Sequence, residues 1–189
     1  MNYDSQHFVA AFEEWRMRME GYQLPAWEDF PALELYMDQV TVLINQYLEP
    51  FETDRNSDST VTPAMINNYV KMKIVPPPVK KRYTKIHLAY LVMVCMLKQT
   101  LSMEMIRRVI PVDLEEQEVR AIYQTFVNNQ KGAFGLLLDL LNKEALTTLA
   151  EGQTGEVRDM MLQAAIFSNL SRALTRLVLT LPEKEENKP

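Results

Sequence analysis

The sequence predicts a mostly α-helical protein. Hydrophobic residues occupy 47% of the 189 positions, and only five residues are glycine. This composition is typical of a compact helical chain. Apolar residues recur at spacings of three and four rather than two, and proline and glycine separate the periodic segments. A chain of this length is long enough for one or two domains with a substantial core.

The N-terminal segment, residues 1–31, is predicted to contain one helix and one loop. The helix spans residues 4–20, and its apolar stripe, at spacings of four, three and four, consists of Phe8, Phe12, Trp15 and Met19. We expect this stripe to contact the core or another subunit. Residues 22–31 contain two prolines and three aromatic residues. We expect this loop to lie over the core, held there by Trp27 and Phe30.

A second helix is predicted over residues 32–50, ending at Pro50. Its broad apolar face consists of Leu33, Tyr36, Met37, Val40, Leu43, Ile44 and Tyr47. This helix is expected to support the one that follows. The loop between them, residues 51–61, is rich in acidic and small polar residues, which predicts an exposed and mobile connection.

Residues 60–110 differ from the rest of the chain in charge. They contain nine basic residues and one acidic residue, which gives nine minus one, or +8, in a chain whose net charge is −5. The remaining residues therefore sum to −13. Such a basic segment is typical of a surface that binds a polyanion. A solvated basic face that docks on the chain's own acidic parts is the alternative, and charge alone does not decide between them.

A short helix is predicted over residues 62–73, because Thr62 can cap it and Pro63 suits the first helical position. Ile66 and Val70 lie four residues apart and indicate its buried face. The opposite face carries Ala64, Asn67, Asn68 and Lys71. Asparagine and lysine side chains can bind base edges and phosphates. Because adjacent asparagines are unfavourable within a helix, a requirement other than local stability is expected to retain them.

Three consecutive prolines, residues 76–78, end this helix and predict an extended segment. The basic stretch Val79-Lys80-Lys81-Arg82-Tyr83 follows. Thr84 can then cap a largely buried helix over residues 85–99, and Ser102 can cap a last short helix. The predicted order is short helix, proline-stiffened basic wing, buried helix and short helix.

This order and its motifs resemble the DNA-binding half of the MerR superfamily. Ile74-Val75-Pro76 matches the exit from the recognition helix, Arg82-Tyr83-Thr84 matches the closure of the wing, and residues 101–106 match the final turn. More closely, residues 24–110 resemble the bacterial domain-of-unknown-function family 1836. The resemblance implies a MerR-like winged helix-turn-helix domain over residues 32–110. Asn67 stands where that superfamily usually has an arginine, and Lys73 stands where the exit glycine does.

The segment 111–181 is predicted to form a helical hairpin or small bundle. One helix should begin with a capping-box-like motif at residues 113–116, run to about residue 130 and be loosened or broken at residues 131–135. An apolar run, a glycine turn and a helix over residues 156–181 follow, and residues 182–189 are a solvated tail. The apolar surface exceeds what two helices can hide from water. We expect homodimerisation through residues 112–181, although packing on the helix 4–20 would also explain it.

Several functions find no support in the sequence. One cysteine, Cys95, and two distant histidines cannot form a metal cluster. No nucleotide-binding glycine loop or nucleophilic signature is present, so we expect neither an enzyme, nor a cofactor, nor a metal. Cys95 is expected in the core, and His87 is expected to be a structural histidine. No run of 18 apolar residues and no signal-peptide pattern occurs, which predicts a cytoplasmic protein without membrane contact.

The leading hypothesis is a DNA-binding transcriptional regulator that binds double-stranded DNA. The helix 62–72 would enter the major groove, and the wing 79–83 would follow the backbone. The candidate contact residues are Thr62, Ala64, Asn67, Asn68, Lys71, Lys73, Lys80, Lys81, Arg82 and Tyr83. A protein-interaction adaptor that keeps the fold without sequence-specific DNA binding is the alternative. A third hypothesis is a sensor with a small-molecule effector pocket within residues 112–181.

Overall fold

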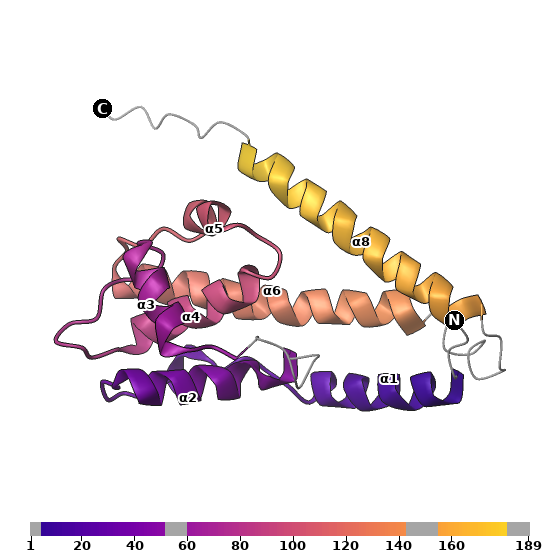
Figure 1. The fold of residues 1–189 in the computed structure, drawn as a ribbon, viewed down its shortest axis with the longest axis horizontal. Helices are drawn as coiled ribbons and strands as arrows, with labels where there is room; N and C mark the ends of the chain where they lie inside the picture. Colours follow the sequence, from indigo (N-terminus) through magenta and orange to yellow (C-terminus); the bar gives the residue numbers. More distant parts are fainter. Residues whose placement is uncertain (1–4, 52–59, 143–154, 181–189) are drawn as a thin grey trace.

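The computed structural model describes residues 5–51, 60–142 and 155–180. In these ranges the protein is mostly helical and contains no β-strand longer than an isolated bridge. Figure 1 shows the shorter helices gathered at one end of an elongated molecule, while α1 and the last part of α6 extend towards the other. The prediction of a mostly α-helical protein is confirmed.

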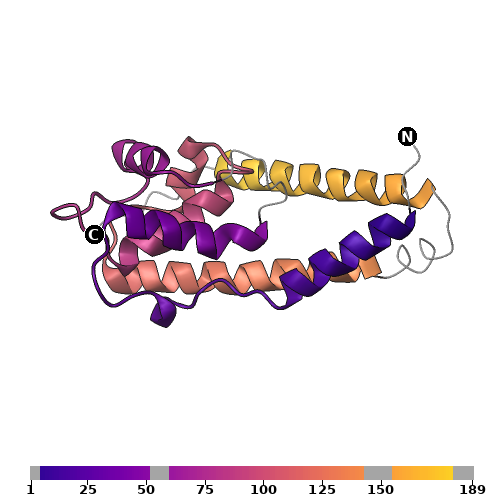
Figure 2. The ribbon, with the colours of Figure 1, turned by 60° about the horizontal axis from the view of Figure 1, so that its bottom comes forward.

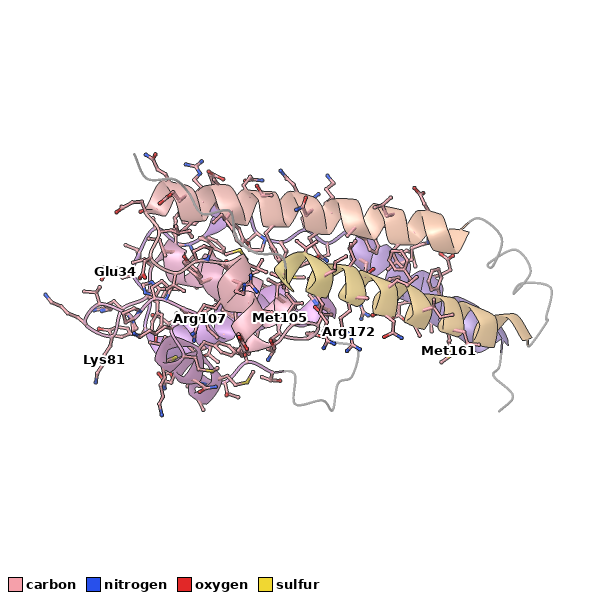
Figure 3. The ribbon with its side chains drawn as sticks, turned by 90° about the horizontal axis from the view of Figure 1, so that it is seen from above. Glu34, Lys81, Met105, Arg107, Met161 and Arg172 are labelled. Carbon is pink, nitrogen blue, oxygen red and sulfur yellow. The ribbon has the colours of Figure 1, made fainter. Side chains whose placement is uncertain are left out.

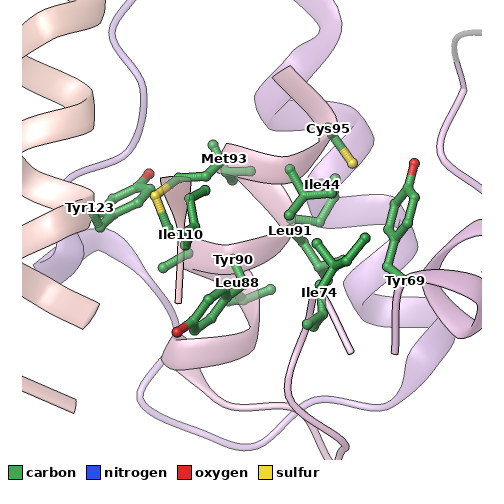
Figure 4. Packing of buried hydrophobic residues seen from close by; sticks show 14 of the residues in the cluster. Ile44, Tyr69, Ile74, Leu88, Tyr90, Leu91, Met93, Cys95, Ile110 and Tyr123 are labelled. Carbon is green, nitrogen blue, oxygen red and sulfur yellow. The ribbon is translucent and has the colours of Figure 1, made fainter. Parts of the chain in front are cut away.

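The centre of the fold is α4 (Lys85–Leu97), in which every residue from His87 to Cys95 is buried. A helix that is apolar on all sides must be covered on all sides. α2 (Met37–Leu48) and α6 (Glu116–Asn142) pack against it. Figure 4 shows side chains of α4 between Ile44 of α2 and Tyr123 of α6. The predicted burial of this helix, including Cys95, is confirmed.

The N-terminal loop lies over this core as predicted. Trp27, in the short 3-10 helix η1 (Trp27–Asp29), and Phe30 are both buried. The Phe30 and Tyr123 rings lie 5.1 Å apart, and the Tyr123 hydroxyl donates a hydrogen bond of 2.8 Å to the carbonyl of Pro25. Aromatic packing and a satisfied buried hydroxyl therefore fix the loop on α6.

α1 (Ser5–Glu20) packs on the second half of α6, where the Trp15 and Phe134 rings lie 5.9 Å apart. Phe12 and Met19, from the predicted apolar stripe, are buried. The side chain of Phe8 lies outside the described residues. Within the described residues, the stripe thus packs on α6 of the same chain.

The prediction that the second helix begins at residue 32 is wrong, because α2 begins at Met37. Leu35 instead pairs its backbone with Tyr83 through hydrogen bonds of 2.8 and 2.9 Å. Leu33 and Tyr36, expected on the buried face, are 80% and 51% exposed. The helical periodicity of the sequence therefore extends further than the helix, because the pairing of Leu35 with Tyr83 holds the residues before Met37 in an extended conformation. The short helix η2 (Glu49–Phe51) follows α2, and most of the predicted mobile loop lies outside the described residues.

The predicted caps of the two short helices are confirmed. In α3 (Pro63–Lys71) the Met65 N–H donates to the Thr62 hydroxyl oxygen at 3.3 Å. In α5 (Met103–Val109) the Met105 N–H donates to the Ser102 hydroxyl oxygen at 3.3 Å. Each cap satisfies one of the free N–H groups at a helix start.

α6 is continuous over its 27 residues, so the predicted interruption at residues 131–135 is wrong. Gly132 and Gly135 each cost about 1 kcal/mol relative to alanine in a helix, but Ala133 and the three leucines that follow Gly135 are among the best helix formers. The predicted start at Asp113 is also wrong. The helix begins at Glu116, and the Glu118 carboxylate accepts the N–H of Glu115 at 2.9 Å.

α8 (Gly155–Thr180) runs back along the molecule and contacts α5 near its end (Figure 2). Large apolar side chains on this helix are more than half exposed, among them Phe167, Leu170, Leu174 and Leu177. Packing within one core therefore does not cover these side chains of α8, whereas it buries Tyr123 of α6 and Phe12 of α1. The predicted tail falls outside the described residues.

A single buried cluster extends from Leu24 to Tyr123, so the core is continuous across positions 31 and 110. The division into domains at those positions stays a prediction. None of the helices in the described ranges is long and apolar enough to cross a membrane.

Candidate nucleic-acid interface

α3 divides cleanly into a buried face and an exposed face. Ile66 and Tyr69 are buried beside α2 and α4, while Thr62, Ala64, Asn67, Asn68 and Lys71 are exposed. The Tyr69 hydroxyl hydrogen-bonds to Cys95, and burial raises the pKa of Tyr69. The predicted outward face of this helix is therefore presented to solvent, and Tyr69 is packed beneath it.

The C-terminus of α3 ends in a Schellman motif. The Lys73 N–H donates to Val70 O at 3.0 Å, and the Ile74 N–H donates to Tyr69 O at 2.9 Å. This motif requires a left-handed residue after the helix, which is usually glycine. Lys73 takes that conformation with φ of 54°. Its exposed side chain adds a cation directly after α3.

The stretch Val79–Arg82, called the basic turn below, forms a tight hairpin. The Arg82 N–H donates to Val79 O at 2.9 Å. Lys80 and Lys81, at its tip, have φ angles of 50° and 62°, as a type I′ turn requires. Asparagine and glycine are the favoured residues there, so two lysines carry a conformational cost. Both lysines are exposed.

Arg82 and Tyr83, the other two candidate contact residues in the predicted wing, both contact other side chains of the protein. The Arg82 guanidinium lies over the Tyr36 ring. Tyr83 is only 2% exposed, and its ring lies 5.3 Å from that of His87. The prediction of Tyr83 as a contact residue is therefore corrected: its buried ring and its pairing with Leu35 anchor the base of the basic turn.

His87 joins the proline segment to the start of α4. Its Nδ1 accepts the Thr84 N–H at 3.0 Å, so the ring proton lies on Nε2, which is 3.4 Å from the carbonyl of Pro77. Burial lowers the pKa of His87, against a smaller opposing effect of the Pro77 carbonyl. The neutral ring therefore fits this place, and the prediction of a structural histidine is confirmed.

Sequence reasoning missed Arg107 of α5. Its guanidinium donates to the carbonyl of Met72, the residue that caps the C-terminus of α3. A cation at this end of a helix is favourable, because the last carbonyl groups have no partner within the helix. The two residues are 35 positions apart, and no local pattern signals their contact.

Several of the exposed cations lie at one end of the molecule. Figure 3 shows Lys81 and Arg107 there, far from Met161 at the other end. Lys71 is the last residue of α3, Lys73 follows α3 closely, and Lys80 lies in the basic turn, so all three belong to the same end. The exposed Glu34 lies nearby, because it precedes Leu35 in the pairing with Tyr83.

The described residues do not bring three His, Cys, Asp or Glu side chains together in a way that could bind a metal ion. Burial raises the pKa of Cys95 to about 11, which makes it a poor nucleophile at neutral pH.

Fold and surface together define a mostly helical protein that carries a group of exposed lysines at one end. Residues 25–126 match the family described as Domain of unknown function (DUF1836). This match covers more than half of the chain, and the chain belongs to this family. The matched region includes α2 to α5 and the start of α6, but neither α1 nor α8. No curated protein and no solved structure shows significant similarity to the chain.

Proposed function

We propose that this protein is a DNA-binding transcriptional regulator of MerR-like type, in which α3 enters the major groove. One observation carries the proposal: Asn67, Asn68 and Lys71 project from the exposed face of a helix whose opposite face is buried. A rigid helix with outward amide side chains is a common reader of base edges, because asparagine can bind adenine with two hydrogen bonds.

The basic turn acts as the wing and follows the phosphate backbone beside the groove. Lys80 and Lys81 are exposed at its tip, and the proline segment, His87 and Tyr83 hold its base. Lys73 and Lys71 contact phosphates at the end of α3. These contacts supply affinity that depends on salt but not on sequence, while the asparagines supply sequence preference.

Two copies associate through α8. Its exposed residues Phe167, Leu170, Leu174 and Leu177 have spacings of three, four and three, which is the repeat of a coiled-coil seam. Exposed contiguous apolar faces mark interaction sites. A dimer presents two copies of α3 and binds two half-sites of one duplex.

Selection of duplexes from a random pool tests sequence-specific binding. We expect an enriched sequence that the protein binds at least about tenfold more tightly than the pool, the discrimination that one good bidentate base contact provides. Asn67→Ala/Asn68→Ala should lose this preference and keep its binding to the pool. Failure of a folded protein to enrich any sequence would contradict the proposed specificity.

A protein-interaction adaptor is the second candidate, and an apolar surface beside the basic turn favours it. Pro31, Leu35 and Val42 line a shallow hollow of about 440 Å³, and Leu33 and Tyr36 are exposed nearby. Apolar patches of this kind bind proteins more often than DNA. An adaptor would show no duplex preference in the selection experiment, and Val42→Asp would abolish its capture of a protein partner.

A further inference from the structure

A second candidate site lies at the opposite end of the core from the basic turn. A cavity of about 500 Å³ opens between the end of α1, the loop that follows it, and the middle of α6. This volume falls within the range of ordinary small-molecule sites, about 300–1,000 Å³. The effector pocket predicted within residues 112–181 stays a prediction, and this cavity differs from it because residues of 19–29 and Phe51 form part of its walls.

Aromatic side chains form much of the apolar wall. Tyr22 and Phe51 lie edge to face, with ring centroids 5.2 Å apart, and Phe134 lines the cavity from α6. The Tyr22 hydroxyl is occupied, since it donates to the carbonyl of Tyr47. These rings therefore offer faces and edges, which favour a flat aromatic ligand.

The charged groups of the lining differ in their partners. Glu20 accepts a hydrogen bond of 2.9 Å from Arg16, and Asp29 accepts the N–H of Ala26 at 2.8 Å. Lys131 also lines the cavity, and among the described residues it forms no ion pair. One helical turn before it, Asn128 already accepts from Gln124 at 3.3 Å, which leaves its amide N–H groups available as donors. The polar end of the cavity can thus supply an ammonium group and an amide donor to an anion.

We propose that this cavity binds a small aromatic carboxylate. The ring lies between the Tyr22–Phe51 pair and Phe134, and the carboxylate is bound by Lys131 and Asn128. The site is independent of the proposed DNA binding, because its walls share no residue with α3 or the basic turn. Ligand binding at this site can therefore be measured on the protein in the absence of DNA.

Two glycines of α6 make a matched pair for this test. A Cβ atom added at Gly132 or at Gly135 would meet nothing within 4 Å, and either substitution improves helix propensity. Gly135 lines the cavity, and Gly132 does not. Gly135→Leu therefore fills the cavity without disturbing the fold, and Gly132→Leu is its control.

The experiment measures binding of phenylacetate, phenylacetamide and phenethylamine by isothermal titration calorimetry. We expect saturable binding of phenylacetate to the native protein and to Gly132→Leu. Gly135→Leu should bind it at least about tenfold more weakly, which corresponds to about 1.4 kcal/mol. Lys131→Met should bind phenylacetate and phenylacetamide equally, whereas the native protein should prefer phenylacetate by about fivefold, the effect of one exposed charge pair.

Three results would overturn the proposal. The first is the absence of saturable phenylacetate binding to the folded native protein. The second is equal affinity of Gly132→Leu and Gly135→Leu, which would mean binding elsewhere, for example on α8. The third is tighter binding of phenethylamine than of phenylacetate, which would mean that Glu20 and Asp29 set the charge of the ligand.

Discussion

The guanidinium carbon of Arg82 lies 3.7 Å from the centroid of the Tyr36 ring. Leu35 pairs with Tyr83 in antiparallel register, which sets the neighbouring residues, Tyr36 and Arg82, opposite each other. The start of α2 and the basic turn are thereby joined by backbone pairing and by a cation–π contact. The position of the proposed wing thus depends on a residue that precedes α2.

A double-mutant cycle on Tyr36→Leu and Arg82→Met tests this contact. Cation–π pairs at exposed sites contribute about 0.5–1 kcal/mol, so we expect a coupling of that size in the free energy of urea unfolding. Purely additive effects of the two substitutions would show that the stacked arrangement contributes nothing to stability.

Replacing the two lysines at the tip of the basic turn should separate stability from function. Lys80→Asn/Lys81→Gly relieves two left-handed residues, each of which costs about 1–2 kcal/mol. We expect a higher free energy of unfolding together with weaker binding of duplex DNA, because two cations are lost. Lys98→Gly is the control: that residue is right-handed, with φ of −59°, and glycine there should not stabilise. Unchanged or lower stability of the double variant would show that the left-handed conformations of Lys80 and Lys81 do not destabilise the protein.

Acid should destabilise the protein through His87. Its pKa is lowered in the folded state, so the unfolded chain binds a proton more readily. The stabilisation is complete above about pH 6.5, the ordinary value, and is lost as the pH falls towards the folded-state pKa. We expect the free energy of unfolding to fall more in the native protein than in His87→Gln as the pH is lowered from about 7.5 to about 5.5, which crosses the ordinary histidine pKa of about 6.5. Equal pH dependence of the two proteins would be inconsistent with a neutral, buried His87.

Charged substitutions on α8 should abolish the proposed dimer. Leu170→Glu/Leu174→Glu places two carboxylates in the apolar seam, where burial would be costly, and light scattering should then show a monomer. Ser168→Glu/Asn169→Glu lies on the other side of the same helix and should leave the native mass unchanged. A native protein that is already monomeric at the concentrations used for DNA binding would contradict association through α8.

Local chemistry explains which parts of the fold could be predicted from the sequence. Thr62 and Ser102 cap their helices because capping needs only residues a few positions apart. The uniform apolar composition of α4 likewise indicated its burial. Tyr36 could not be placed in this way, because the pairing of Leu35 with Tyr83 overrides a helical periodicity that continues through it.

The candidate interface was predictable to a similar extent. The exposed face of α3 follows from helical spacing, so Asn67, Asn68 and Lys71 lie as expected. Arg107 was missed because its contact with Met72 joins distant positions. The left-handed conformation of Lys73 could be inferred only from its place after α3, because the residue that usually indicates such a conformation is glycine.

The most direct test of the proposed DNA binding is its salt dependence, measured by fluorescence anisotropy on a pooled random duplex. Three proteins are compared: the native protein, Lys80→Ala/Lys81→Ala, and Arg18→Ala/Arg120→Ala, which removes the same charge away from the basic turn. We predict that the slope of log affinity against log salt is smaller by about 1.8 in the lysine variant, or about 0.9 per phosphate contact, and unchanged in the arginine variant. No salt-dependent binding by the folded native protein, or equal slopes for all three, would contradict DNA binding through the basic turn.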